Sequence, residues 1–218
     1  MPSMIPPSML FHYALPVRRV DGIPQRTRTL FDLSEECRLV FPAELNRAPQ
    51  WADFRIAWND DGLAVQVEVG GKKQRPRCDV ERPSESTGVQ LWIDTRNTQT
   101  IHRAGRFCHA FALLPCGSKG DDPVAFALPI ARAREDAMLA DATRIRCASD
   151  VHRERWRLNA WIPGEILMGF DPDSFPRLGF YYAVRDAELG EQTLNVGRDF
   201  PFSHDPSQWS TLELTAAR

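Results

Sequence analysis

Short runs of alternating apolar and polar residues dominate the chain, and turn residues separate them. In the clearest case, residues 54–58 and 63–69 flank the segment Asn59-Asp60-Asp61-Gly62. Apolar residues recur at every second position in both runs, which is the period of a strand with one buried face. An Asp-Gly pair provides the positive φ that a tight turn between two strands requires. This segment therefore predicts a β-hairpin.

The same pattern predicts further strands. Residues 89–94, 156–162 and 178–185 alternate, and residues 107–114 are apolar on both faces, as in a central strand of a sandwich. Shorter or weaker candidates lie at residues 10–15, 124–130, 143–148, 192–196 and 211–215. Helical periodicity is confined to residues 131–140 and 164–169. The pattern predicts an all-β fold, an antiparallel β-sandwich of jelly-roll type with one or two short helices.

The chain has 218 residues, enough for one large domain or two small ones. No internal repeat, low-complexity linker or change of composition divides it, and residues 70–87 form a polar stretch expected to be a surface loop. We therefore expect a single domain over residues 9–218, preceded by a loose tail over residues 1–8.

Composition narrows the classes of function. The net charge is −2, so no global positive field favours nucleic acid, and no apolar run approaches the roughly 20 residues of a membrane-spanning helix. The N-terminal residues show no secretory signal, which favours a cytoplasmic protein. Arginine outnumbers lysine 24 to 3. Two explanations of this bias are open. One is codon usage in a GC-rich genome, and the other is a need for guanidinium groups that bind a polar or anionic ligand.

Five cysteines, Cys37, Cys78, Cys108, Cys116 and Cys147, are scattered without a CxxC spacing. An odd number at such distances is not typical of a disulfide framework or a zinc site. We expect reduced thiols, with one disulfide left open.

Several motifs contain residue types of known chemistry without its spacing. Ser203, His204 and Asp205 are adjacent, whereas the members of a hydrolase triad come from separate elements. Residues 70–73, Gly-Gly-Lys-Lys, lack the first glycine of a phosphate-binding loop. Turns or loops are the expected structures here, and no catalytic residue is predicted.

Metal ligands are equally unsupported by spacing. His102 and His109 would point to opposite faces of a strand, so they do not form a site with Asp94. The acidic pairs at residues 121–122 and 171–173 do not follow the alternation of a calcium loop. No cofactor is expected, and whether the protein binds a metal ion stays open.

Tryptophans provide the more suggestive pattern. Trp58 and Trp156 fall in the apolar phase of their strands and are expected in the core. Trp92 and Trp161 fall in the polar phase, beside hydrogen-bonding side chains. An aromatic ring among polar groups suits a sugar, which has apolar C–H faces and a rim of hydroxyls. The alternative is that each ring packs beneath a loop that covers the sheet.

Five segments resemble motifs of the family 9 carbohydrate-binding modules and their DOMON-like relatives. They are residues 59–67 ("W-x-x-x-x-L-Y-V-x-V"), 88–94 ("DDxVEIFID"), 160–167 ("E-x-x-IP-x-x-x-L"), 178–186 ("G-F-x-V-x-x-N-D") and 208–214 ("W-G-x-I-x-L"). They occur in the family's order from about Asp53 to Thr215, which is most of the chain.

The resemblance implies a β-sandwich, usually non-catalytic, that binds saccharides and sometimes holds structural calcium. The first glutamate of "VEI" falls on Gln90, the next strand would contribute Arg106 or His109, and the Asn-Asp pair falls on Arg185 and Asp186. Sugar-binding members also clamp the ring between two tryptophans, but residues 82–87 and 187–190 contain no aromatic residue. The chain therefore departs from the family at the clamp.

The resulting hypothesis is a non-enzymatic module for a carbohydrate or similar polyhydroxylated ligand. Its candidate ligand-binding residues are Gln90, Trp92, Asp94, Arg106, His109, Tyr181, Arg185 and Asp186. In this hypothesis Trp92 stacks on the sugar, the carboxylates and Gln90 bind hydroxyls, and the arginines donate hydrogen bonds. The alternative is a structural or protein-interaction sandwich that has lost the sugar site and binds a protein partner or a second copy of itself.

Overall fold

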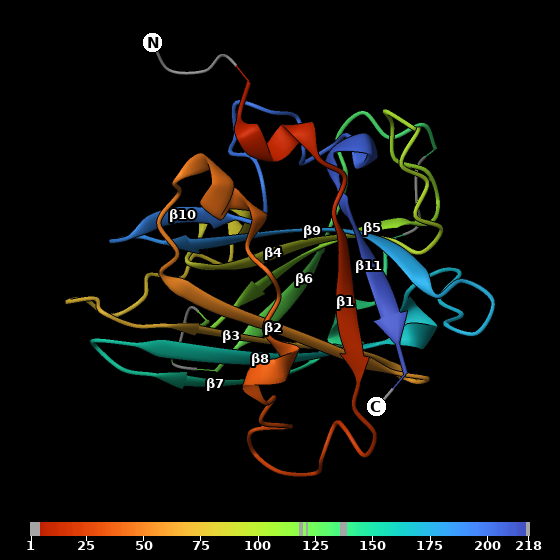
Figure 1. The fold of residues 1–218 in the computed structure, drawn as a ribbon. Helices are drawn as coiled ribbons and strands as arrows, with labels where there is room; N and C mark the ends of the chain where they lie inside the picture. Colours follow the sequence, from red (N-terminus) through yellow and green to blue (C-terminus); the bar gives the residue numbers. More distant parts are fainter. Residues whose placement is uncertain (1–4, 118–119, 121, 136–138, 217–218) are drawn as a thin grey trace.

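Strands and short 3-10 helices make up the regular structure in the computed structural model, which describes residues 5–117, 120, 122–135 and 139–216 (Figure 1). The strands are β1 (Ala14–Arg19), β2 (Ala52–Asn59), β3 (Gly62–Val69), β4 (Gly88–Asp94), β5 (Cys108–Leu114), β6 (Val124–Leu128), β7 (Arg146–Val151), β8 (Trp156–Pro163), β9 (Arg177–Asp186), β10 (Gly190–Thr193) and β11 (Ser210–Thr215). The 3-10 helices are η1 (Pro7–Leu10), η2 (Glu35–Cys37), η3 (Pro42–Asn46), η4 (Pro83–Glu85), η5 (Ala142–Arg144), η6 (Gly164–Ile166) and η7 (Pro206–Gln208).

The two predicted helices have different outcomes. The signal at residues 164–169 corresponds to η6, a single 3-10 turn. Residues 131–135 and 139–140 are not helical, and residues 136–138 lie outside the described residues. No helix in the described part of the chain is both long and apolar enough to cross a membrane.

The strands form two layers that are joined through the paired strands β1 and β11, which we call the seam. Their order is β6-β5-β4-β9-β11-β1-β2-β3-β8-β7, with β10 paired to β9. In Figure 1 the layer with β4, β5 and β9 lies above the layer with β2, β3 and β8, and β1 and β11 run across between them. Pairing is antiparallel except at β1, which runs parallel to both β11 and β2. The predicted all-β sandwich is confirmed.

The predicted hairpin is formed by β2 and β3, with Phe54 opposite Val67 and Trp58 opposite Leu63. Gly62 at its turn has a φ of +152°, and a Cβ there would lie 2.2 Å from the carbonyl oxygen of Ile162. Only glycine fits this position, because both the backbone conformation and the neighbouring strand exclude a side chain.

The main core fills the space between the layers. Phe54 of β2 stacks on Tyr182 of β9 with ring centroids 4.0 Å apart, which joins the two layers directly. Trp58 and Trp156 are both buried, as their apolar phase predicts. Burial of aromatic and aliphatic surface between the layers stabilises the sandwich.

A smaller apolar cluster covers the opposite face of the β2–β3–β8 layer. Ala57, Ala64 and Trp161 pack there beneath Leu30 and Phe31 of the segment that joins β1 to β2. Trp161 is therefore buried at 4% exposure by a covering loop. The sequence leaves two interpretations of Trp161, contact with a sugar or packing beneath a loop, and the structure shows packing beneath a loop.

Three strands are displaced along the chain from their predicted positions. β1 begins at Ala14 rather than residue 10, because Leu15 and Val17 are the residues that alternate inward. β7 and β10 are also displaced from residues 143–148 and 192–196. Within the expected N-terminal tail, Ser8 is buried in η1, and its backbone N–H donates to Asn46 Oδ1 at 3.0 Å.

Cys78 and Cys116 form a disulfide, with Cα atoms 5.7 Å apart. The sequence favours reduced thiols and leaves one disulfide open, and the structure has that disulfide: the loop before β4 and the end of β5 bring together two cysteines that are far apart in sequence. Cys37, Cys108 and Cys147 are free. Burial raises the pKa of the Cys108 and Cys147 thiols to about 12, so both remain protonated near neutral pH.

Candidate functional site

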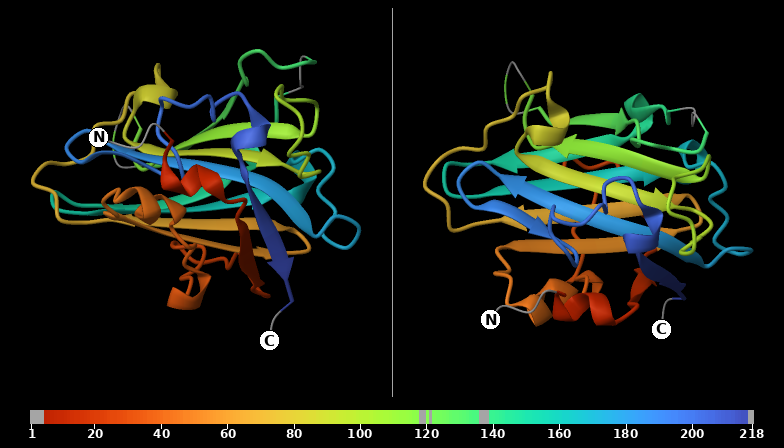
Figure 2. Two further views of the ribbon diagram at one scale, coloured as in Figure 1. Left: turned by 45° about the horizontal axis from the view of Figure 1, so that its top comes forward. Right: turned by 90° about the horizontal axis from the view of Figure 1, so that it is seen from above.

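The outer face of the β6-β5-β4-β9 layer carries part of the predicted site. On β4, Val89, Leu91 and Ile93 point into the core, so Gln90 and Trp92 face outward. The register pairs Trp92 with Ala110 of β5 and with Tyr181 of β9, which places these side chains on the same face. Figure 2, right, is a view onto this layer.

A cleft of about 460 Å³ lies over this face. Trp92, Ala110 and Leu128 form its apolar floor, and Phe200 and Phe202 line it from the segment between β10 and β11. Glu85, Gln90, Arg198 and the serines Ser84 and Ser203 provide its polar lining. An apolar surface with a few hydrogen-bonding groups, at this volume, is typical of a small-ligand site.

The aromatic floor of the cleft is closely packed. Phe202 meets Trp92 edge-on with ring centroids 5.4 Å apart and stacks on Tyr181 at 4.5 Å. Trp92 consequently exposes only 4% of its surface, and Phe200 is the aromatic ring of the cleft that remains half-exposed. Trp92 therefore forms part of the floor and has little surface left for contact with a ligand, whereas Phe200 retains some.

Tyr181 fixes the segment that forms one wall of the cleft. Its hydroxyl donates to the carbonyl of Val196 and accepts from the N–H of Val196 at 2.8 Å. The side chain is fully buried, and burial raises its pKa. Its structural role explains why Tyr181 offers no surface to a ligand.

The polar rim is held by its own hydrogen bonds. Gln90 Nε2 donates to the carbonyl of Ser84 at 2.9 Å, which leaves the amide oxygen as an acceptor beside the cleft. Arg198 donates to Glu191 through Nε at 2.8 Å and through a second nitrogen at 2.6 Å. The hydrogen bonds to Glu191 raise the pKa of Arg198, so the guanidinium is a fixed positive group.

Two predicted residues belong to this layer without lining the cleft. Arg185 is half-buried and lies opposite Glu191 in the β9–β10 pair. Asp94 is buried and accepts hydrogen bonds from the N–H groups of Arg96, at 2.9 Å, and Thr98, at 2.6 Å. It therefore stabilises the turn after β4, and we no longer assign it to a ligand.

Three predicted residues lie elsewhere. His109 faces the core, stacked against Phe111, and burial lowers its pKa, so the ring is neutral. Asp186 points between the layers, where it bonds to Lys72 and Trp156. Arg106 is exposed on the loop before β5 and lines a different hollow. The eight candidates thus do not form one site: the cleft unites only Gln90 and Trp92.

The cleft residues that sequence reasoning missed are Glu85, Arg198, Phe200 and Phe202. They come from η4 and from the segment after β10, which have no periodic pattern to place them. One signal was present: two phenylalanines flank Pro201 in an otherwise polar stretch. Aromatic residues in a connecting segment point to a covered or binding face of the adjoining sheet.

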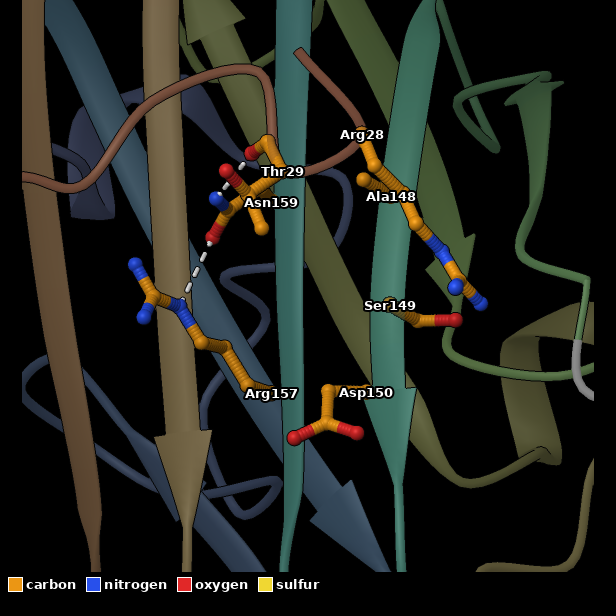
Figure 3. A pocket seen from close by; sticks show the side chains of 7 residues that line it. All are labelled: Arg28, Thr29, Ala148, Ser149, Asp150, Arg157 and Asn159. Atoms are coloured by element: carbon orange, nitrogen blue, oxygen red, sulfur yellow. Dashed lines mark hydrogen bonds between the residues drawn. The ribbon is translucent and has the colours of Figure 1, made fainter.

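A second hollow, of about 310 Å³, lies on the outer face of the opposite layer (Figure 3). Asn159 Nδ2 donates there to the carbonyls of Thr29, at 2.5 Å, and Phe31, at 2.6 Å. Arg157 donates to Asp32 at 2.6 Å. These groups hold the segment at residues 29–32 against β8, so their polarity is already used inside the protein.

No protein-family model matches the chain, and no curated protein shows significant similarity to it. Solved structures do match. One is a family 9 carbohydrate-binding module from Caldicellulosiruptor kristjanssonii in complex with cellotriose, with 13% identity, a TM-score of 0.59 and coverage of 94% of this chain and 95% of the module. A second is a family 9 module from the same organism in complex with glucose, with 14% identity, a TM-score of 0.57 and coverage of 93% of this chain and 97% of the module. A third is a candidate carbohydrate-binding protein from Bacteroides uniformis, with 16% identity, a TM-score of 0.51 and coverage of 75% of this chain and 78% of that protein.

Within the described residues, no three His, Cys, Asp or Glu side chains gather as a metal-binding group. The likeness to the two family 9 modules extends over 94% and 93% of the chain.

Proposed function

Because the chain has the fold of the family 9 carbohydrate-binding modules, we propose that it is a non-catalytic module that binds a saccharide in the cleft over β4. The observation that carries this proposal is the composition of the cleft: an aromatic floor and wall, edged by amide, carboxylate and guanidinium groups. Two solved structures of this fold hold cellotriose and glucose.

The lining suits both parts of a sugar ring. The C–H face of a pyranose packs on the half-exposed ring of Phe200, which takes the place of the tryptophan clamp that the sequence lacks. Hydroxyls at the ring edge meet acceptors on Glu85 and Gln90 and donors on Arg198. A single stacking ring and an open rim support weak, reversible binding.

The same lining argues against glycoside hydrolysis. That reaction uses two carboxyl groups that face each other across the bond to be cleaved. Among the described residues that line the cleft, Glu85 is the one carboxylate. Recognition without turnover therefore fits this site better than catalysis.

A different surface favours the alternative of a protein-interaction module. Leu10 and Phe11, at η1, and Leu45, in the adjacent η3, expose 69%, 58% and 51% of their surfaces. Exposed apolar residues in one region are a feature of interaction surfaces. A molecular mass that rises with protein concentration, and that falls when Phe11 is changed to serine, would support this alternative.

Titration with saccharides tests the proposed function. The unmodified protein is screened by thermal shift against mono- and oligosaccharides, including glucose and cellotriose, and each hit is measured by calorimetry. At a ligand concentration of 100 Kd, binding stabilises the folded state by about 2.7 kcal/mol. Phe200→Ala is expected to weaken binding about two- to tenfold, since stacking of this kind contributes about 0.5–1.5 kcal/mol.

Phe175→Ala is the matched control, because Phe175 is an exposed phenylalanine that does not line the cleft. It should leave the affinity unchanged. Absence of binding to every saccharide by a folded protein would refute the proposed function. Equal binding by the two phenylalanine variants and the unmodified protein would refute the cleft as its site.

A further inference from the structure

A hollow of about 570 Å³ near the cleft has three arginines among the residues that line it. Arg103, Arg106 and Arg134 contribute to its wall, together with Phe107 and one acidic residue, Glu135. We call it the arginine hollow. Among the described residues that line it, three arginines against one glutamate give a positive balance, in a chain whose net charge is −2.

These arginines are positioned without being neutralised. Arg103 donates to the carbonyls of Arg132 at 2.9 Å and Ala133 at 3.1 Å, which fixes the segment that carries Arg134. The Arg106 guanidinium lies 4.9 Å from the ring centroid of Phe107. Within the described residues, no carboxylate forms an ion pair with any of the three, whereas Arg19, Arg38, Arg55, Arg144 and Arg157 each have one.

The arginine hollow and the cleft lie near each other on two sides. Ala131 lines the cleft and Arg134 lines the hollow, and their Cα atoms are at most about 11 Å apart because they are three positions apart in the chain. On the other side, Ser203 lines the cleft, and the nearby Asp205 accepts a hydrogen bond from His102 Nδ1 of the hollow at 3.2 Å. A ligand longer than one sugar unit can therefore extend from one to the other.

We propose that the ligand is an acidic polysaccharide, with an uncharged face of one sugar in the cleft and an anionic substituent of a neighbouring sugar in the arginine hollow. This inference rests on the proposed function and specifies its ligand class. The guanidinium group donates paired hydrogen bonds that match a carboxylate or a sulfate ester, and it stays charged at all relevant pH values. Arg106, which fails to reach the cleft, acquires a role at this second position.

Matched pairs of polymers test the inference, with affinity measured by retardation in native gels. Polygalacturonate is compared with its carboxyl-reduced form, and dextran sulfate with dextran, so that the two sources of negative charge are separated. We expect at least one acidic polymer to bind more tightly than its neutral counterpart. The difference should shrink at high salt, because ions screen exposed charges.

Arg106→Ala combined with Arg134→Ala is expected to reduce the affinity for the acidic polymer about tenfold and to leave the neutral polymer unaffected, as two exposed charge-assisted contacts are lost. Arg26→Ala combined with Arg28→Ala removes the same charge from exposed residues that do not line the hollow. This control variant should bind as the unmodified protein does.

The outcomes separate the two proposals. If neutral and acidic forms bind equally, the cleft remains a saccharide site and the acidic ligand class is refuted. If the acidic preference survives in the Arg106/Arg134 variant, or is lost in the Arg26/Arg28 variant, the arginine hollow is not its source. If no polymer and no saccharide binds to the folded protein, both proposals are wrong.

Discussion

At the scale of single residues, Lys72 and Asp186 form an ion pair that is almost completely withdrawn from water, with side-chain exposures of 1% and 0%. Asp186 also accepts from Trp156 Nε1 at 3.0 Å and from the N–H of Glu188 at 2.9 Å. Burial acts to raise the pKa of Asp186, but the hydrogen bonds from Lys72, Glu188 and Trp156 outweigh it and lower the pKa. The carboxylate is therefore ionised and structural.

Lys72→Met should lower the free energy of unfolding by about 3–5 kcal/mol, because it leaves the Asp186 carboxylate buried without a counter-charge. Urea denaturation at pH 7 measures the loss. Arg177→Met is the control, since the Arg177–Glu213 pair is exposed and contributes less than about 1 kcal/mol. Equal losses in the two variants would show that burial of the Lys72–Asp186 pair has no special weight.

The same pair predicts a pH dependence. The folded-state pKa of Asp186 lies below its unfolded value of about 4, so its contribution to stability is present above that value. It is lost as the pH falls through the folded-state pKa. The fall in stability below pH 4 should therefore be shallower for Asp186→Asn than for the unmodified protein, provided that the variant folds.

At the scale of elements, the segment between β10 and β11 depends on one hydroxyl. Tyr181 bonds to both the carbonyl and the N–H of Val196, and it accepts from the N–H of Asn195 at 3.3 Å. Tyr181→Phe leaves these buried backbone groups unpaired, so we expect a loss of about 1–3 kcal/mol in stability. Hydrogen exchange should accelerate over residues 195–203, and saccharide affinity should fall with it.

Tyr182→Phe is the matched control. Its hydroxyl has one contact, with Gln192 Nε2 at 3.5 Å, so the change should be mild. If exchange over residues 195–203 is the same in the two variants, the Tyr181 hydroxyl does not hold this wall of the cleft.

The elements that could be predicted from the sequence are those whose pattern is local. The β2–β3 hairpin follows from period-two alternation and an Asp-Gly turn, and the outward direction of Trp92 follows from the phase of β4. The residue that covers Trp92 could not be predicted in this way, because Phe202 is distant in sequence and belongs to a segment without periodicity. The parallel pairing of β1 with β11 leaves no local trace either, because alternation says nothing about which strand is the partner.

At the scale of the whole molecule, the Cys78–Cys116 disulfide connects the loop before β4 to the end of β5 across 38 residues. In the chain-entropy account, a bridge over this span stabilises the folded state by about 4 kcal/mol. The same loop contains η4, whose Glu85 lines the cleft. Both stability and saccharide affinity should therefore depend on the oxidation state of this pair.

Cys78→Ser combined with Cys116→Ser should lower the melting temperature and weaken saccharide binding, and a reducing agent should have the same effect on the unmodified protein. Cys147→Ala, at a free cysteine, is the control. An unmodified protein that melts and binds identically with and without reductant would contradict the prediction. Disulfides persist mainly in oxidising compartments, so the state of this bridge in the cell depends on where the protein resides.

The seam between the layers has a consequence for synthesis. β1 is paired over residues 14–18 with β11, which is the last strand of the sandwich in chain order, and it meets β2 at only two positions. At about 5–20 residues per second, β1 waits some 10–40 s on the ribosome for its main partner. During that interval hairpins can form within both layers, but the edges of β1 and β9 that will pair with β11 have no partner strand. The sandwich is closed only when its newest strand docks beside its oldest one.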